Sequence, residues 1–188
     1  ERRVFFQLPE GMQHPHTPTH IPLPEINENQ HPVFNGLMQI APKWADIEWI
    51  IAHTSLPVIL KGIVHPQDAK LALQYGVQGL IISNHGGRVL DTCISPLTAL
   101  QLIKKVVPTD FPFILDGGIR RGSDVFKAIA LGATAVCIGR PYIYGLATAG
   151  ALGVAHVLKI LKEEFEITMA LMGTATVNDI NQEHILHK

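Results

Sequence analysis

Strand-like apolar runs alternate with helical segments along most of this chain, and every run is followed by polar or glycine residues. The expected strands cover residues 58–63, 80–83, 111–115 and 135–138. The expected helices cover residues 43–54, 66–75, 97–107 and 123–131, and most of 143–172 with a break near 150–153. Repeated strand–helix units predict an α/β fold with a parallel sheet, because crossover helices usually join parallel strands. A closed barrel and an open doubly wound sheet both satisfy this pattern.

The polar residues after the second strand, Ser83-Asn84-His85-Gly86-Gly87-Arg88, form the densest chemical cluster in the sequence. His85 can take or give a proton near neutral pH, and Arg88 can grip a carboxylate through two parallel hydrogen bonds. At the carboxyl end of a strand, where α/β folds place their sites, this pair suits a small organic acid as substrate. The plainer interpretation is a polar loop with a capping serine and a hydrogen-bonded histidine.

The same six residues resemble the active-site signature of the FMN-dependent α-hydroxy acid oxidases and dehydrogenases, such as glycolate and lactate oxidase. The similarity extends from Leu8-Pro9 to the C-terminus and is strongest from Leu56 onward. Val89 departs from the pattern, because many members carry Gln there. The resemblance implies a (β/α)8 TIM barrel, of which this chain would supply about the last four βα units. Because eight units need about 250 residues, residues 43–188 are expected to be the C-terminal half of an FMN-binding barrel.

Two further loops suit the phosphate of a cofactor. Asp116 to Gly122 reads D-G-G-I-R-R-G before a helix, and Gly139-Arg140-Pro141 follows the last strand. Glycines, arginines and helix N-termini favour anions, and the loops after the last two barrel strands commonly hold phosphate. The resemblance implies FMN contacts for a set of nine residues, while Arg121 is expected to form a surface ion pair. The nine are Lys61, Ser83, Asp116, Gly117, Gly118, Ile119, Arg120, Gly139 and Arg140.

The resemblance also implies a reaction: oxidation of a small L-2-hydroxy acid, of the glycolate or lactate type, to the 2-oxo acid. His85 would be the general base, Arg88 would hold the substrate carboxylate, and Lys61 would stabilise negative charge on the reduced flavin. Oxygen or another electron acceptor would complete the cycle, and the family is commonly homotetrameric. The family's tyrosines and the Asp that pairs with the catalytic His belong to the N-terminal half. We therefore expect weak or no activity from this chain alone; Arg2 or Arg3 could match a second substrate arginine.

Two other functions remain open. A half-barrel leaves two sheet edges unpaired, so the chain could be a catalytically silent module that binds or assembles through them. It could also belong to another FMN barrel enzyme, such as the type 2 isopentenyl diphosphate isomerase, which would not need the pair His85 and Arg88. An NAD enzyme is not supported, because no G-x-G-x-x-G follows a strand.

Composition narrows the partners. With 15 basic and 16 acidic residues and a formal net charge of −1, nothing indicates binding to nucleic acid. No apolar run approaches the roughly 20 residues of a membrane span, and neither a signal peptide nor a C-terminal S-K-L is seen, so a cytoplasmic location is expected. Cys93 and Cys137 lack metal spacing and are expected to be buried thiols. Residues 1–42, rich in Pro, His, Asn and Gln, are expected to be an irregular, variable loop segment without a metal.

Overall fold

The computed structural model describes residues 10–12 and 25–186, and the chain divides into two units, Glu1–Lys43 and Trp44–Lys188. The described part of the first unit contains a π-helix, η1 (Pro32–Gly36), followed by a 3₁₀ turn, η2 (Leu37–Gln39). These two short turns lie inside the segment that was expected to be irregular, and its character as a variable loop stays a prediction. Side chains close the turn locally: His31 Nδ1 accepts the Val33 N–H at 3.2 Å, and Asn35 Oδ1 accepts the His31 N–H at 2.9 Å. Arg2, Arg3 and the histidines of residues 14–20 lie outside the described residues.

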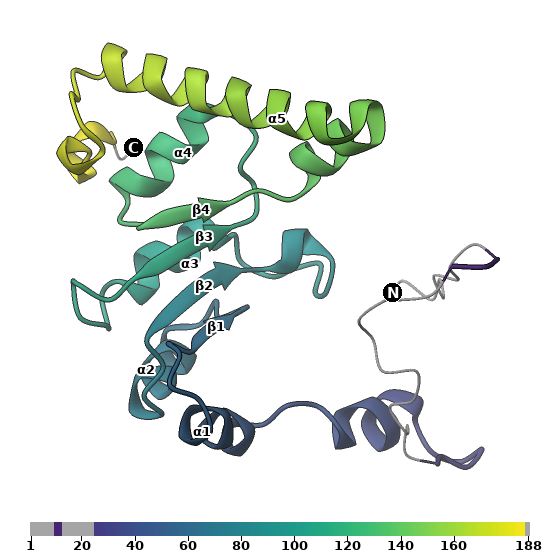
Figure 1. Cartoon of the computed structure of the whole chain (residues 1–188). Coiled ribbons are helices and arrows are strands. Elements are labelled where there is room, and N and C mark those ends of the chain that lie inside the picture. The colour runs from purple at the N-terminus through teal and green to yellow at the C-terminus, as the bar shows by residue number, and fades with distance from the viewer. Residues whose placement is uncertain (1–9, 13–24, 187–188) are drawn as a thin grey trace. The chain divides into compact units, whose positions relative to one another are not determined.

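The second unit is built on a four-stranded parallel sheet in the order β1-β2-β3-β4 (Figure 1). The strands are β1 (Ile59–Lys61), β2 (Gly79–Ser83), β3 (Phe113–Asp116) and β4 (Ala135–Cys137). Helices alternate with them: α1 (Trp44–Ala52), α2 (Pro66–Gln74), α3 (Pro96–Ile103), α4 (Gly122–Ala130) and α5 (Arg140–Leu171). This is a partial (β/α)8 barrel, as predicted, and all four strands point their carboxyl ends toward the same edge.

Local chemistry explains where the helices begin and end. His65 caps α2 by accepting the Gln67 N–H, and Ser95 caps α3 by accepting the Thr98 N–H at 3.2 Å. Gly76 ends α2 with a φ of 81°, and the Val77 N–H bonds back to the Ala72 carbonyl. That is the glycine C-cap expected from the sequence, since a left-handed φ costs glycine little.

The two predicted boundaries on either side of Pro108 were wrong, by four residues at the end of α3 and by two at the start of β3. Helix α3 stops at Ile103 rather than at residue 107, because the chain leaves it in turns before Pro108. Strand β3 starts at Phe113 rather than at residue 111, because the Phe111 N–H bonds back to the Pro108 carbonyl in a turn. Both errors fall at the apolar stretch around Pro108, where hydrophobicity alone does not separate a helix end from a strand start.

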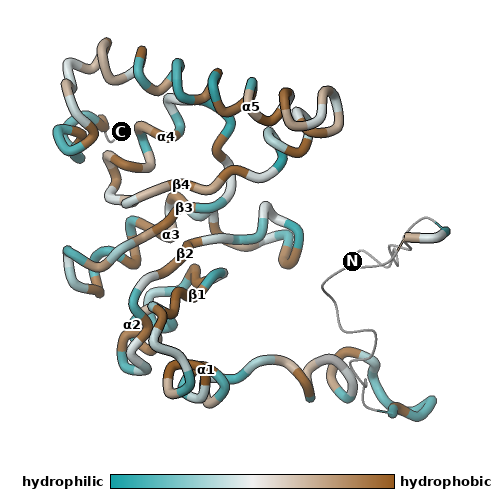
Figure 2. Tube along the Cα trace, in the orientation of Figure 1, coloured by the Kyte–Doolittle hydropathy of each residue, from teal (hydrophilic) through white to brown (hydrophobic). Residues whose placement is uncertain are grey.

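The hydrophobic core lies between the central strands and helices α2, α3 and α4, and it includes Leu80, Ile82, Leu100, Phe113 and Leu115. Figure 2 shows apolar residues concentrated along the strands. Strand β2 is buried along most of its length, whereas the edge strand β1 has only one half-buried residue. The central strands are therefore firmly held, and the polar residues at their carboxyl ends start from rigid positions.

Helix α5 is long and apolar enough to cross a membrane: its best 18-residue window has a mean hydropathy of 1.4 and is 11% buried. The helix is nevertheless broken, because Gly150 has φ 57° and ψ −141° and the chain turns there (Figure 1). Gly145 and Gly153 meet across the turn so closely that a Cβ on either would overlap the other's backbone. A helix folded back on itself does not offer one straight apolar span, and the absence of a membrane span stays a prediction.

Candidate functional site

Three of the predicted site residues meet at the carboxyl ends of neighbouring strands. Lys61, Ser83 and Asp116 are the last residues of β1, β2 and β3. The Lys61 ammonium pairs with Asp116 Oδ2 and lies 3.2 Å from Ser83 Oγ. The Ser83 hydroxyl donates to Asp116 Oδ2 at 2.7 Å. Strand register explains this meeting: Ser83 lies opposite Asp116, and Lys61 opposite Ile81 can lean along the strand to reach both.

The charge state of this cluster follows from its contacts. Burial by itself would raise the pKa of Asp116, but the hydrogen bonds from Lys61 and Ser83, together with the positive charges of Lys61 and His85, lower that pKa below its usual range. Asp116 is therefore an anion at neutral pH, held beside an ammonium. Lys61 keeps 45% of its side chain exposed, so its charge still faces the open edge of the sheet.

The loop after β2 holds His85 in an unusual backbone conformation. Its φ is 54°, in the left-handed region that residues other than glycine rarely adopt. The His85 N–H donates to Ser83 Oγ at 3.0 Å, which ties the loop to the cluster. Among the described residues, no hydrogen bond to the His85 imidazole is present, so the exposed ring is free to act on a ligand. Backbone strain of this kind gathers at functional sites.

Asn84 is a residue of this loop that the sequence analysis quoted but gave no role. Its Oδ1 accepts the Gly87 N–H at 3.3 Å, and its Nδ2 donates to the Ile94 carbonyl at 3.4 Å. One half-buried amide therefore holds both the turn η3 (His85–Gly87) and the returning end of the loop. The sequence did carry a signal for this role, because Asn84 lies directly before His85 and Asn commonly caps short turns.

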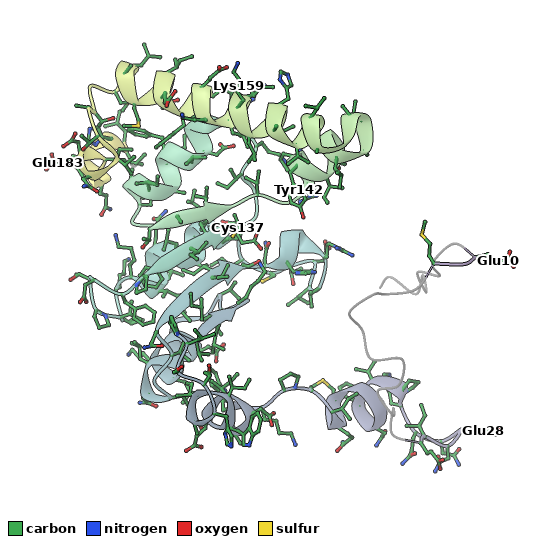
Figure 3. The ribbon with its side chains drawn as sticks, viewed as in Figure 1. Glu10, Glu28, Cys137, Tyr142, Lys159 and Glu183 are labelled. Carbon is green, nitrogen blue, oxygen red and sulfur yellow. The ribbon has the colours of Figure 1, made fainter. Side chains whose placement is uncertain are left out.

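The loops that follow β3 and β4 reach the same edge of the sheet. Arg140, the first residue of α5, donates from Nη2 to the Gly86 carbonyl at 3.4 Å, so the last loop contacts the His85 loop directly. Gly139 precedes it, and no side chain caps this end of α5. Cys137 ends β4 and Tyr142 lies in the first turn of α5, as Figure 3 shows. Cys137 and Cys93 are only half-buried, contrary to the expectation of buried thiols.

The loop after β3 divides its residues between the core and the surface. A Cβ on Gly117 would come within 3.3 Å of Pro96 and 3.4 Å of Asn84, whereas Gly118 has nothing nearby. Ile119 is buried in the core, so only its main chain could contact a cofactor. Arg120 is exposed, and the Arg121 guanidinium pairs with Glu164 at 2.9 Å, which confirms the predicted ion pair of Arg121.

Arg88 is a predicted site residue whose side chain the structure does not join to the others. It is the C-cap of the turn η3 and is exposed, and no described residue forms a hydrogen bond or ion pair with its guanidinium. The sequence placed it three residues after His85, but one turn of 3₁₀ helix alone does not decide where a long exposed side chain lies. Its role as a carboxylate clamp stays a prediction.

Comparison with known proteins agrees with this arrangement. A profile of the FMN-dependent dehydrogenases matches residues 2–187. The chain belongs to the FMN-dependent dehydrogenase family. It is 56% identical over 142 residues to a 2-hydroxyacid oxidase of Dictyostelium discoideum, covering 76% of this chain and 37% of that protein. It is 49% identical over 162 residues to an L-lactate oxidase of a Roseobacter species, covering 86% and 44%.

A solved structure of a mandelate oxidase variant with a monooxide FMN adduct superposes with a TM-score of 0.72 at 43% identity, covering 75% of this chain and 45% of that one. This member of the FMN-dependent dehydrogenase family spans about two fifths of the length of these curated relatives. Its residues suit a flavin phosphate: Arg120 and Arg140 supply cations, Gly118 leaves open space, and the first N–H groups of α5 have no capping side chain.

Proposed function

We propose that this chain supplies the C-terminal half of the site of an enzyme that oxidises a small L-2-hydroxy acid with FMN. The observation that carries the proposal is the joined cluster at the strand ends, in which Lys61, Ser83 and Asp116 contact one another and Ser83 holds the His85 loop. A structural ion pair alone would not require a strained histidine beside it. The family membership supports the same chemistry.

Each residue has a role that follows from its chemistry. Arg120, Arg140 and the main chain of Gly118 and Gly139 would hold the phosphate, and Lys61 would neutralise negative charge at the flavin ring. FMN, when bound, would supply the acceptor for the hydrogen that leaves the substrate's Cα together with its two electrons. His85 would remove the hydroxyl proton of the substrate, and the exposed Arg88 would hold its carboxylate. The substrate would leave as the 2-oxo acid, and oxygen or another acceptor would finally take the electrons.

A flavin titration tests the proposal. We expect the purified chain to bind FMN, with the binding followed by the change in the flavin's visible absorption or fluorescence. Substituting Arg140→Gln should weaken binding by about tenfold, the loss of roughly one charge-assisted hydrogen bond to phosphate. Lys159→Gln is the control, because Lys159 is exposed on α5 and pairs with Glu163 at 3.6 Å. A chain that does not bind FMN, or binds it equally well after Arg140→Gln, would contradict the proposal.

A silent assembly module is the second candidate, and exposed apolar surface favours it. Tyr144 and Leu152, which line one hollow on the folded-back part of α5, are 60% and 81% exposed, and contiguous exposed apolar patches mark surfaces that another protein covers. The same titration separates the two functions. A colourless chain that self-associates and takes up no flavin is expected from the module, whereas the enzyme half binds FMN.

A further inference from the structure

The N-terminus of α4 is the obvious place for a phosphate in this fold, yet the structure has already filled it. Glu164, from the distant part of α5, accepts the Gly122 N–H on Oε2 at 2.9 Å and the Arg121 guanidinium on Oε1 at 2.9 Å. Asp124 Oδ2 accepts the main-chain N–H groups of Arg120 and Arg121 at 3.0 and 2.9 Å. Two carboxylates therefore occupy the donors that an anion would use there.

The contact between α4 and α5 is closely packed. Gly122 is buried, and a Cβ at this position would overlap the α5 backbone at Glu164 and Phe165. Only glycine lets α5 come this close, and the close approach is what brings the Glu164 carboxylate to the Gly122 N–H. Arg121 is 72% exposed while Glu164 is 29% exposed, so the carboxylate is the fixed partner and the arginine closes over it.

The loop that this contact holds is the one that carries Arg120. Arg120 lies two residues before Gly122, its main chain is tied to Asp124, and its side chain is exposed at the carboxyl edge of the sheet. Helix α5 supplies the other cation from its own first turn, because Arg140 reaches the Gly86 carbonyl from there. The two segments of α5, which meet at the turn near Gly150, thus anchor the β3 loop through Glu164 and carry the next phosphate-binding group at Arg140.

We propose that Glu164 is a positioning residue for the flavin phosphate. It occupies the N-terminus of α4, so that the phosphate is directed to Arg120 and to the uncapped N-terminus of α5, and it fixes the loop on which Arg120 lies. The inference rests on the proposed function, and it predicts an effect on the phosphate and none on the flavin ring. Glu164 itself touches neither.

The test is the substitution Glu164→Gln, measured with two ligands. Glutamine replaces one carboxylate oxygen with an NH2 donor and removes the negative charge, so it cannot accept the Gly122 N–H and the Arg121 guanidinium at the two separate positions that they occupy. FMN affinity should fall by about tenfold, the usual effect of losing a group that orients a binding residue. Riboflavin, which has the same ring and no phosphate, should bind within about twofold of its original affinity, which is within the ordinary scatter of Kd values.

Two control substitutions test whether the change in FMN affinity is specific to Glu164. Glu163→Gln removes a neighbouring, exposed glutamate whose partner is Lys159, and it should change neither affinity. Arg121→Gln leaves Glu164 bonded to Gly122 and should reduce FMN affinity less than Glu164→Gln does. If the Glu164→Gln variant folds poorly, Arg121→Gln takes its place in the test. If the original chain binds FMN, an equal loss of affinity for FMN and riboflavin, or no loss of affinity for FMN, would overturn the inference. An original chain that binds neither flavin would overturn the proposed function and the inference together.

Discussion

Ser83 is the residue on which the described site depends most at the scale of single side chains. It is 3% exposed, and its hydroxyl contacts the Lys61 ammonium, the Asp116 carboxylate and the His85 N–H. A hydroxyl is the smallest group that both donates and accepts, which suits a position between an anion, a cation and a main-chain donor. Alanine at this position would leave the His85 N–H without its partner and Asp116 Oδ2 with the Lys61 ammonium alone.

We therefore predict that Ser83→Ala lowers the free energy of unfolding by about 1–3 kcal/mol, the cost of leaving buried polar groups unsatisfied. Urea denaturation followed by circular dichroism measures the change. Ser55→Ala is the control, because Ser55 is exposed before β1 and should change stability by less than about 0.5 kcal/mol. Equal stability of the two variants would show that the Ser83 contacts contribute nothing.

Asn84 gives a second prediction at this scale. Asn84→Ala removes the two side-chain hydrogen bonds that Asn84 makes within the His85 loop, so the loop should open more often and Arg88 should become a better trypsin site. Limited proteolysis, with the cut after Arg88 read by mass spectrometry, should show a rate increase of about threefold or more, as expected for about 1 kcal/mol of lost hydrogen bonding. Asn181→Ala, at the far end of the chain, is the matched control, and a similar increase there would argue against a local effect.

At the scale of elements, the contact between α4 and α5 should respond to pH. The Gly122 N–H first, and then the Arg121 guanidinium, lower the pKa of Glu164 below its ordinary value. A carboxyl with a lowered pKa in the folded state stabilises the fold above its unfolded pKa of about 4.3 and loses that contribution as pH falls through the folded pKa. Glu164→Gln should therefore lower the urea midpoint at pH 7, and the difference from the original chain should shrink below about pH 4.

Urea titrations at several pH values measure this difference, with Glu166→Gln as the control. Glu166 lies two residues further along α5 and pairs with Lys162 at 3.6 Å on the exposed face, and exposed pairs of this kind contribute little. A pH-independent difference between Glu164→Gln and the original chain would show that the carboxylate charge is not what stabilises the contact.

The turn inside α5 is the second prediction for an element. Gly153→Ala would push a methyl group into the Gly145 carbonyl across the hairpin, and overfilling a close contact costs about 1–3 kcal/mol. Thermal or urea unfolding measures the loss. Ala147→Ser is the control, because Ala147 is exposed on the same hairpin; a Gly153→Ala variant as stable as this control would mean that the two segments are not packed as described.

For the whole molecule, we predict that the isolated chain binds FMN but does not oxidise a 2-hydroxy acid. The cations that we propose for the phosphate lie in this chain, but among its described residues no carboxylate is hydrogen-bonded to the His85 imidazole to hold an imidazolium formed there. We expect the isolated chain, mixed with FMN and then with L-lactate or glycolate without oxygen, to leave the flavin oxidised. Bleaching of the flavin absorption would show that the chain oxidises the substrate on its own.

The sequence by itself determined the order of strands and helices, the residue types at the strand ends and the family, because these depend on periodicity, caps and motifs a few residues long. Gly76 and the break near Gly150 were predicted from such local signals. Only the tertiary structure decided that Lys61 pairs with Asp116, that Asn84 ties the His85 loop, and that Glu164 closes α4. Those contacts join residues 10 to 55 positions apart in the sequence. Sheet register and helix packing bring such residues together, and no short sequence pattern encodes either one.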